Sequence, residues 1–228
     1  MLYLLLTLLL VALIYGPQFW VRHVWKKFAA DLDEIPGTGG ELAEHLVQRF
    51  KLEGILVEET DEGADHFDPQ GPAVRLSPSN YHGSSLKAVA VAAHEVGHAI
   101  QFHRQERIFL LRRKYIPLAM GFRKAGELLL LLVPIVALVL KSPGLILATI
   151  GLSLLLQLFG VLAYLIVLPE EWDASFNKAL PILIDGEYVP QQHIAAIRTL
   201  LKAAALTYLA SALASILHLG RWALLLRR

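Results

Sequence analysis

Two of the uncharged stretches in this sequence constrain the possible fold more than any other feature. They run from Leu145 to Leu168 and from Ala203 to Leu217, whereas 12 of the 20 acidic residues lie between Asp31 and Asp68. With 55% hydrophobic and only 18% charged residues, the chain is too apolar for an ordinary soluble domain. The sequence therefore predicts a protein in contact with both water and lipid.

The apolar segments are predicted to cross the membrane as about four helices. Roughly 20 apolar residues span the hydrocarbon layer, and residues 145–168 meet this length. The shorter segment 125–140 precedes residues 145–168 and is joined to them through the turn Ser142-Pro143-Gly144. The two segments are therefore predicted to form a transmembrane hairpin. Residues 1–21 are interpreted as an uncleaved anchor, because basic residues follow their apolar core instead of preceding it. The last span lies within residues 203–228.

Basic residues around these segments predict their orientation. Five of them lie between Arg112 and Lys124, before the hairpin, whereas Lys141 is the only charged residue in its turn. The polar regions, roughly 22–124 and 169–202, are therefore predicted to face the cytoplasm.

Composition excludes several kinds of function. The 21 Lys and Arg residues nearly balance the 20 Asp and Glu residues, so no overall charge favours a nucleic-acid partner. The absence of cysteine excludes disulfides, thiolate metal sites and cysteine nucleophiles. Imidazole and carboxylate groups are therefore the strong metal ligands that the chain offers.

The first polar region is predicted to contain helices and strands. Residues 41–51 have apolar side chains at helical spacing, while residues 55–57 and 74–77 are short apolar runs bounded by turns, as is typical of strands. The strand 74–77 is a candidate for edge pairing with an extended peptide, or else an ordinary hairpin strand. Ser84 or Ser85 is predicted to cap the helix that follows.

That helix carries the motif His94-Glu95-Val96-Gly97-His98. Imidazoles four residues apart lie on one helix face, so both can bind one tetrahedral Zn²⁺. Glu95 is turned about 100° away, and its carboxylate can pass a proton from a zinc-activated water to a leaving amine. A bare match of this kind also occurs on the surface of amphipathic helices. The alanine-rich run before the motif favours the metal site, and Gly97 indicates close approach by another segment.

A catalytic zinc site needs a third protein ligand and an open fourth position. The candidates Glu170, Glu171 and Asp173 follow the predicted hairpin. Two membrane crossings separate His98 from these acids, so the chain is expected to return to the same side. Acids at a helix start are also favoured by the macrodipole, and the spacing alone therefore leaves the third ligand open.

Around these residues the sequence resembles the bacterial membrane-bound neutral zinc metallopeptidase family, the YugP-like proteins. The resemblance rests on HEVGHAIQ at 94–101, LPEEWDAS at 168–175 and DHFDP at 65–69, with further similarity at 203–208. It covers nearly the whole chain in order. The family is similar in turn to HtpX-type gluzincin membrane peptidases, whose third ligand is the Glu of a Glu-aromatic-x-Ala segment.

The resemblance implies a metal site with one zinc ion. Carried over by position, Glu171 is the third ligand beside the two histidines, and Glu95 is the general base of a zinc metalloendopeptidase. The chain departs from the family at Glu170, where an apolar residue is usual, and at Trp172, where Phe is usual, so the choice of carboxylate stays open. Implied substrates are peptides or membrane proteins at the lipid bilayer of the bacterial inner membrane.

Together these features predict a mainly α membrane protein with about four transmembrane helices and a small α+β zincin-like cytoplasmic catalytic region. No feature indicates an oligomeric state. The predicted parts are an N-terminal anchor (1–21), a catalytic region with the HExxH helix (22–124), a transmembrane hairpin (125–168), a third-ligand segment (169–202) and a C-terminal transmembrane helix (203–228).

Four further residues are candidates for supporting roles. Asp173 is predicted either to orient a ligand histidine, because metal-bound imidazoles usually donate their other N–H to an acceptor, or to cap a helix. His66, His82 and Tyr208 are candidate stabilisers of the transition state, with loop hydrogen bonding or helix packing as the alternative for each.

Two alternative functions are considered. A site-2-protease-like enzyme would place HExxH inside the membrane and use Asp185 of Asp185-Gly186 as the third ligand, but Lys87, Arg104 and Arg107 flank the motif helix. A catalytically inactive zinc-binding membrane scaffold would keep the ligands without a competent base, whereas Glu95 is present.

Overall fold

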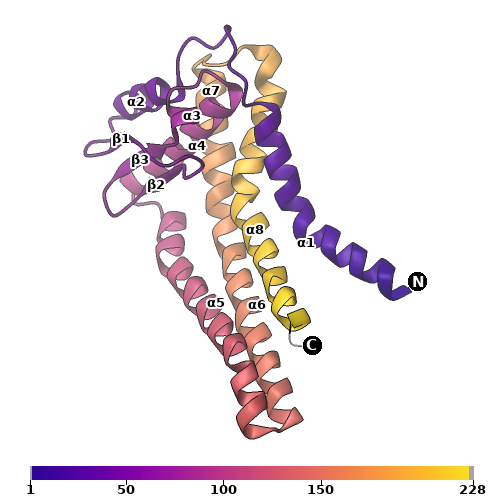
Figure 1. The fold of residues 1–228 in the computed structure, drawn as a ribbon. Coiled ribbons are helices and arrows are strands. Elements are labelled where there is room, and N and C mark those ends of the chain that lie inside the picture. The colour runs from indigo at the N-terminus through magenta and orange to yellow at the C-terminus, as the bar shows by residue number, and fades with distance from the viewer. Residues whose placement is uncertain (1, 226–228) are drawn as a thin grey trace. The chain divides into compact units, whose positions relative to one another are not determined.

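The computed structural model describes residues 2–225. Within this range, side chains are not described for residues 2–4, 6–8, 10, 13, 14, 161, 163, 164, 208 and 211–225. The chain is mainly helical with one three-stranded sheet (Figure 1). The elements are α1 (Leu2–Lys27), α2 (Gly39–Arg49), β1 (Leu56–Glu59), β2 (His66–Asp68), β3 (Ala73–Leu76), α3 (Pro78–Tyr81), α4 (Leu86–His103), α5 (Arg107–Leu140), α6 (Pro143–Trp172), the π-helix η1 (Asp173–Ala179), α7 (Leu180–Asp185), the 3₁₀-helix η2 (Gln191–His193) and α8 (Ile194–Leu225).

Two compact units make up the chain. The first contains the residues up to Gln18, Leu111–Leu168 and the residues from Tyr208 onward. The second contains Phe19–Leu110 and Pro169–Thr207. Helix α4 and the segment that begins at Pro169 therefore belong to one unit, although α5 and most of α6 lie between them in the sequence.

Within the first unit, α5 and α6 form an antiparallel hairpin (Figure 1). The Gly126 carbonyl of α5 accepts a 2.7 Å hydrogen bond from the Ser153 hydroxyl of α6. Farther from the turn, a Cβ atom added at Gly160 of α6 would lie 3.1 Å from the Ala119 carbonyl oxygen of α5. Small residues thus let the two backbones approach closely, as in helix pairs that pack without a hydrophobic driving force. The chain reverses between Leu140 and Pro143, so two helices meet where the sequence predicted a hairpin turn.

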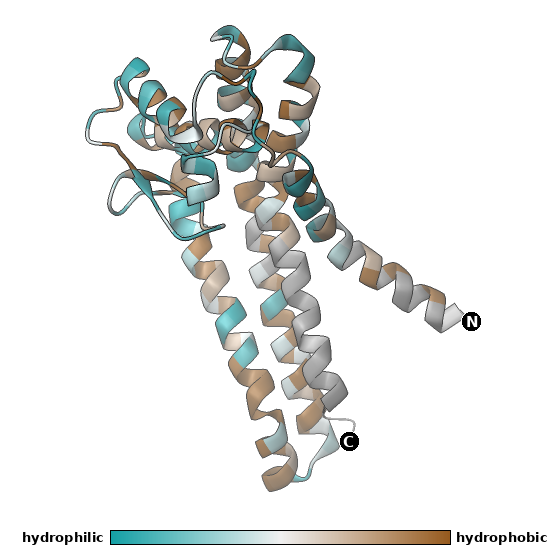
Figure 2. Ribbon diagram, turned by 45° about the horizontal axis from the view of Figure 1, so that its top comes forward, coloured by the Kyte–Doolittle hydropathy of each residue, from teal (hydrophilic) through white to brown (hydrophobic). Residues whose placement is uncertain are grey.

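The prediction of about four transmembrane helices is wrong. Among the described residues, one helix is long and apolar enough to cross a membrane, the continuous helix Pro143–Asp185 that contains α6. Helix α5 is apolar along its lower part (Figure 2), but residues 128–140 number only 13, and its last 18 residues include Arg123, Lys124 and Glu127. The predicted first span is described in part, and the predicted last span lies largely among residues whose side chains are not described.

The sheet in the second unit has the strand order β1-β3-β2. Central strand β3 pairs parallel to β1, with Val57 opposite Val74, and antiparallel to β2, with Phe67 opposite Val74. Val74 is fully buried. The hypothesis that strand 74–77 offers an edge to a peptide is therefore wrong, because both of its sides are already paired within the chain.

Helix α4 forms the core of the second unit. Its N-cap is Ser85, whose hydroxyl accepts a 3.0 Å hydrogen bond from the Ala88 backbone N–H, so the predicted cap is confirmed. Apart from Lys87, every residue from Leu86 to Gln101 is buried. An alanine-rich sequence suits this position, because small side chains let neighbouring elements pack closely on every face of the helix.

Helix α4 packs closely against another segment at Gly97. A Cβ atom added there would lie 2.7 Å from the carbonyl oxygen of Ala174 and 3.2 Å from its Cα atom. Ala174 belongs to η1, a π-helix, an irregular element that is rare and frequently marks functional sites. The predicted close approach at Gly97 is confirmed, and it brings the motif helix against the segment that follows Glu171.

We expect Gly97→Ala to destabilise the protein by about 1–2 kcal/mol. Alanine favours helix formation by about 1 kcal/mol over glycine, but overpacking a close backbone contact costs about 1–3 kcal/mol, and a carbonyl group cannot rotate away as a side chain can. Thermal unfolding of the detergent-purified protein measures the change. Gly121→Ala is the matched control, because nothing lies within 4 Å of a Cβ atom at that helical glycine. Equal unfolding temperatures for the two variants would contradict the expectation.

Candidate metal centre

Two imidazoles from α4 form the first half of the site. His94 and His98 are separated by one helical turn, and their ring centroids lie 4.7 Å apart. Their exposed fractions are 5% and 3%. Both rings are therefore buried. They lie on the same face of α4, as the four-residue spacing predicts.

Glu171, one residue before the end of α6, completes the cluster. One of its oxygens, Oε2, lies 3.3 Å from His94 Nε2 and 3.3 Å from His98 Nε2. One ligand atom from each of the three residues lies within 4.8 Å of the other two. Because zinc bonds of about 2.0–2.1 Å place neighbouring corners of a tetrahedron about 3.3–3.4 Å apart, this donor set fits a zinc ion. Three protein ligands leave the fourth position open.

The cluster closes despite the failed membrane prediction. His98 and Glu171 are 73 residues apart, and the antiparallel course of α5 and α6 returns the chain before Glu171. The sequence predicted that the ligands converge because two membrane crossings separate them. Helix α5 does not meet the requirements for a membrane span, so only one of these crossings is supported. The hairpin itself, and not the number of spans, explains why the ligands meet.

A second carboxylate adds to the charge around His98. Glu170 is fully buried, and its Oε1 lies 3.3 Å from His98 Nδ1. Burial lowers the pKa of the His98 imidazole, but the Glu171 and Glu170 carboxylates outweigh this effect and raise it to about 10. The site therefore strongly favours a positive charge. Glu171 Oε2 approaches the Nε2 atoms of both histidines, whereas Glu170 Oε1 lies beside Nδ1, the other ring nitrogen of His98.

Each imidazole has a polar neighbour at Nδ1. Ser175 Oγ lies 3.0 Å from His94 Nδ1 and 3.0 Å from the Leu201 carbonyl oxygen. Since a hydroxyl has a single proton, donation to Leu201 leaves Ser175 to accept from His94 Nδ1–H. On the other imidazole, Gln101 Oε1 lies 2.9 Å from His98 Nδ1. Both contacts leave Nε2 directed toward Glu171.

Asp173 does not contact an imidazole in the described part of the chain. Its Oδ2 accepts a 2.8 Å hydrogen bond from Gln101 Nε2 and pairs with the Lys178 ammonium, while its Oδ1 accepts from Asn177 at 2.8 Å. Any influence of Asp173 on the ligands therefore passes through Gln101. Its predicted direct contact with a histidine is replaced by an indirect one.

Glu95 lies next to the first ligand in α4 and is 8% exposed. In the described residues its carboxylate forms no hydrogen bond or ion pair. A buried carboxylate without an internal partner remains available to accept a proton, which suits the role of a general base.

The three predicted transition-state stabilisers are not brought into the cluster by any described contact. His66 Nδ1 donates to the Ala64 carbonyl at 2.6 Å on the flank of β2. His82 lies on the surface and pairs with Glu59 at 2.8 Å. Tyr208 belongs to α8, but its side chain is outside the described residues.

The DHFDP segment has a structural position. Asp65 accepts hydrogen bonds from the Ser77 backbone N–H at 2.7 Å and from Asn80 Nδ2 at 2.8 Å. Phe67 packs on Phe102 with ring centroids 5.3 Å apart. These contacts join β2 to β3, α3 and the end of α4, so the segment stabilises the scaffold that holds the motif helix.

Comparison with known proteins agrees with this geometry. The model of a family described as "Putative neutral zinc metallopeptidase" matches residues 3–227. The chain belongs to this zinc metallopeptidase family. It is 33% identical over 226 residues to "Putative membrane protease YugP" of Bacillus subtilis (strain 168), with 99% of this chain and 96% of the relative covered. The family resemblance predicted from the sequence is confirmed. No solved structure matches the chain significantly.

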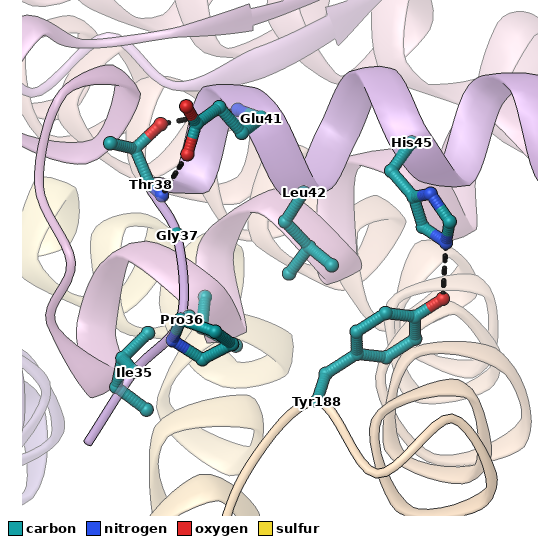
Figure 3. Close-up of a pocket in the computed structure, with 9 residues that line it drawn as sticks. Ile35, Pro36, Gly37, Thr38, Glu41, Leu42, His45 and Tyr188 are labelled. Atoms are coloured by element: carbon teal, nitrogen blue, oxygen red, sulfur yellow. Dashed lines mark hydrogen bonds between the residues drawn. The ribbon is translucent and has the colours of Figure 1, made fainter.

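Two pockets lie elsewhere among the described residues of the second unit. One, of about 190 Å³, is lined by residues including Pro36, Leu42, His45 and Tyr188 (Figure 3). The His45 ring nitrogen and the Tyr188 hydroxyl are 2.7 Å apart there. None of the three clustered ligands lines this pocket.

The other pocket, of about 250 Å³, contains Asp185 among its lining residues, together with Arg49, Arg104 and Lys178. Asp185 is not a member of the metal-ligand cluster in the described residues. The site-2-protease-like arrangement therefore receives no support from the position of this carboxylate.

Sequence reasoning missed two polar residues of the candidate metal centre, Gln101 and Ser175. Both are buried side chains that contact a histidine ligand. Gln101 follows His98 by three residues and Ser175 follows Glu171 by four, so helical spacing on the ligand-bearing face was an available signal.

Proposed function

We propose that the protein is a gluzincin-type zinc metalloendopeptidase that binds one zinc ion through His94, His98 and Glu171. The observation that carries this proposal is the position of Glu171 Oε2, 3.3 Å from both Nε2 atoms. Membership of a zinc metallopeptidase family supports the choice of zinc. The buried carboxylates supply the negative charge that a divalent cation requires.

The residues support hydrolysis of a peptide bond by water. Zinc, when bound, supplies a Lewis acid that polarises the substrate carbonyl and lowers the pKa of a water molecule. The Glu95 carboxylate accepts a proton from the attacking water as the new C–O bond forms. Glu95 then gives this proton to the amine nitrogen as the C–N bond breaks, so the carboxylate is regenerated in each cycle.

We further propose that the protein is associated with a bacterial inner membrane through its apolar helix and that the site faces the cytoplasm. The apolar helix Pro143–Asp185 and the relative named a membrane protease support the association. The basic residues between Arg112 and Lys124, against Lys141 alone in the hairpin turn, support the orientation. Substrates would then be peptides or flexible segments of membrane proteins near the lipid bilayer, with no role for nucleic acid.

Metal removal tests the proposed function. We expect detergent-purified protein to contain about one zinc per chain and to cleave an unfolded generic protein substrate. Chelation should reduce cleavage to background, and added zinc should restore it, because the fourth position for water exists only with the ion in place. Metal analysis and gel-based proteolysis measure both. Cleavage that survives complete zinc removal would contradict the proposal, and stoichiometric zinc without cleavage would support the inactive scaffold.

A further inference from the structure

Behind His98, a chain of hydrogen bonds runs from the buried ring through Gln101 to partly buried side chains, away from the proposed metal position. It begins at His98 Nδ1, which lies 2.9 Å from Gln101 Oε1. Gln101 is fully buried, and its amide nitrogen continues the chain to Asp173, which pairs with Lys178. Lys178 in turn donates to Glu106 at 2.9 Å. Beyond His98 itself, none of these side chains is one of the three proposed ligands.

The orientation of the Gln101 amide is determined by its partners. The amide nitrogen lies 3.0 Å from the Glu170 carbonyl oxygen and 2.8 Å from Asp173 Oδ2. A carbonyl oxygen can only accept, and Asp173 Oδ2 already faces the Lys178 ammonium, which can only donate. Both N–H bonds of Gln101 are therefore used on this side. Its oxygen must face His98, where it can only accept.

This arrangement decides which nitrogen of His98 carries hydrogen. An accepting oxygen at 2.9 Å requires a hydrogen on His98 Nδ1. In a neutral imidazole the hydrogen on Nδ1 leaves a lone pair on Nε2, the atom 3.3 Å from Glu171 Oε2. We propose that Gln101, held by Asp173 and Lys178, is a positioning residue that fixes the His98 imidazole for metal binding through Nε2.

Lys178 anchors this chain of contacts. Its side chain is only 10% exposed, and it lies between the Asp173 and Glu106 carboxylates. A buried ammonium between two carboxylates holds Asp173 in place, because removing one charge would leave the others uncompensated. Lys178 thereby links the end of the α4 region to η1 and keeps the acceptor of Gln101 fixed.

The inference rests on the proposed metal centre and is tested by zinc affinity. Gln101→Met keeps the length of the side chain but removes its acceptor and donors. We expect zinc to bind about 10–100-fold more weakly, the usual effect of losing a partner of a metal ligand. Chelator competition measures the affinity. With Co²⁺ in place of zinc, we also expect a shifted visible spectrum, because the His98 ring is no longer held in one orientation.

A matched control separates positioning from packing. Ile100→Val alters a neighbouring buried side chain that cannot form a hydrogen bond, so its zinc affinity and Co²⁺ spectrum should equal those of the wild type. Circular dichroism and thermal unfolding of the zinc-free proteins show whether each variant folds. An unchanged affinity and spectrum in folded Gln101→Met would overturn the inference. A wild type that binds no stoichiometric zinc would instead overturn the proposed function itself.

Lys178 provides a second test if Gln101→Met does not fold. Lys178→Met should weaken zinc binding several-fold, because Asp173 loses the cation that holds it, and Lys178→Arg should recover most of the affinity by restoring a donor. A folded Lys178→Met protein with wild-type affinity, or an equal loss in both Lys178 variants, would refute the role of this anchor.

Discussion

In a Glu95→Gln variant, we expect peptide hydrolysis to fall by about 10²–10⁴-fold while zinc stays bound at the wild-type stoichiometry. The amide has nearly the same shape as the carboxylate but cannot accept the proton of the attacking water, and general base catalysis contributes about this factor. Glu95 is not among the three clustered ligands, so zinc affinity should change little. Proteolysis of an unfolded substrate and zinc analysis of the same preparation measure the two quantities.

Glu53→Gln serves as the control for this substitution. Glu53 is exposed and belongs to the same unit, so its variant should cleave at the wild-type rate. If the Glu95→Gln protein keeps its zinc and cleaves as fast as the control, the assignment of the general base is wrong.

In a Glu171→Ala variant, we expect zinc affinity to fall by more than about 100-fold. That factor is the upper end of the loss caused by mutating an outer partner of a metal ligand, and a direct ligand contributes more. The change also removes a buried carboxylate from between two imidazoles, each 3.3 Å from its oxygen. Zinc content after gel filtration and chelator competition measure the loss, and proteolysis should disappear with it.

Two further substitutions decide between the candidate carboxylates. Asp185→Ala changes the third ligand of the site-2-protease-like alternative and should leave zinc content unchanged, because Asp185 lines a separate pocket. Glu170→Gln keeps the backbone carbonyl that accepts from Gln101 and should retain zinc. Tight stoichiometric zinc in Glu171→Ala, together with its loss in either of the other two, would show that the wrong acid was assigned.

Local spacing was sufficient to predict one side of the site. The four-residue separation of His94 and His98 determines their common face whatever the surroundings, because helix geometry alone places them. Gly97 likewise indicated a close neighbour, which proved to be the backbone of Ala174. The third ligand required more, since three acids within four residues fit the spacing and only the family resemblance favoured Glu171.

The errors have identifiable physical causes. Hydrophobicity indicated the hairpin, but a span also needs sufficient length without charge, which α5 lacks near Arg123 and Lys124. Strand β2 is the polar segment His66–Asp68, whose composition does not indicate a strand. Without β2, the sequence gives no sign that β3 is paired on both sides. Helical spacing places Gln101 and Ser175 near the ligands, but their partners 69–81 positions away depend on tertiary packing that local patterns do not encode.

The order of the ligands along the chain also affects biosynthesis. A ribosome makes α4, with two imidazoles and the proposed general base, long before it reaches Glu171, which follows His98 by 73 residues. Ser175 and its partner, the carbonyl of Leu201, are made later still. A nascent chain thus has no complete ligand set until the α5–α6 hairpin has been synthesised. The proposed metal centre therefore cannot assemble during most of translation.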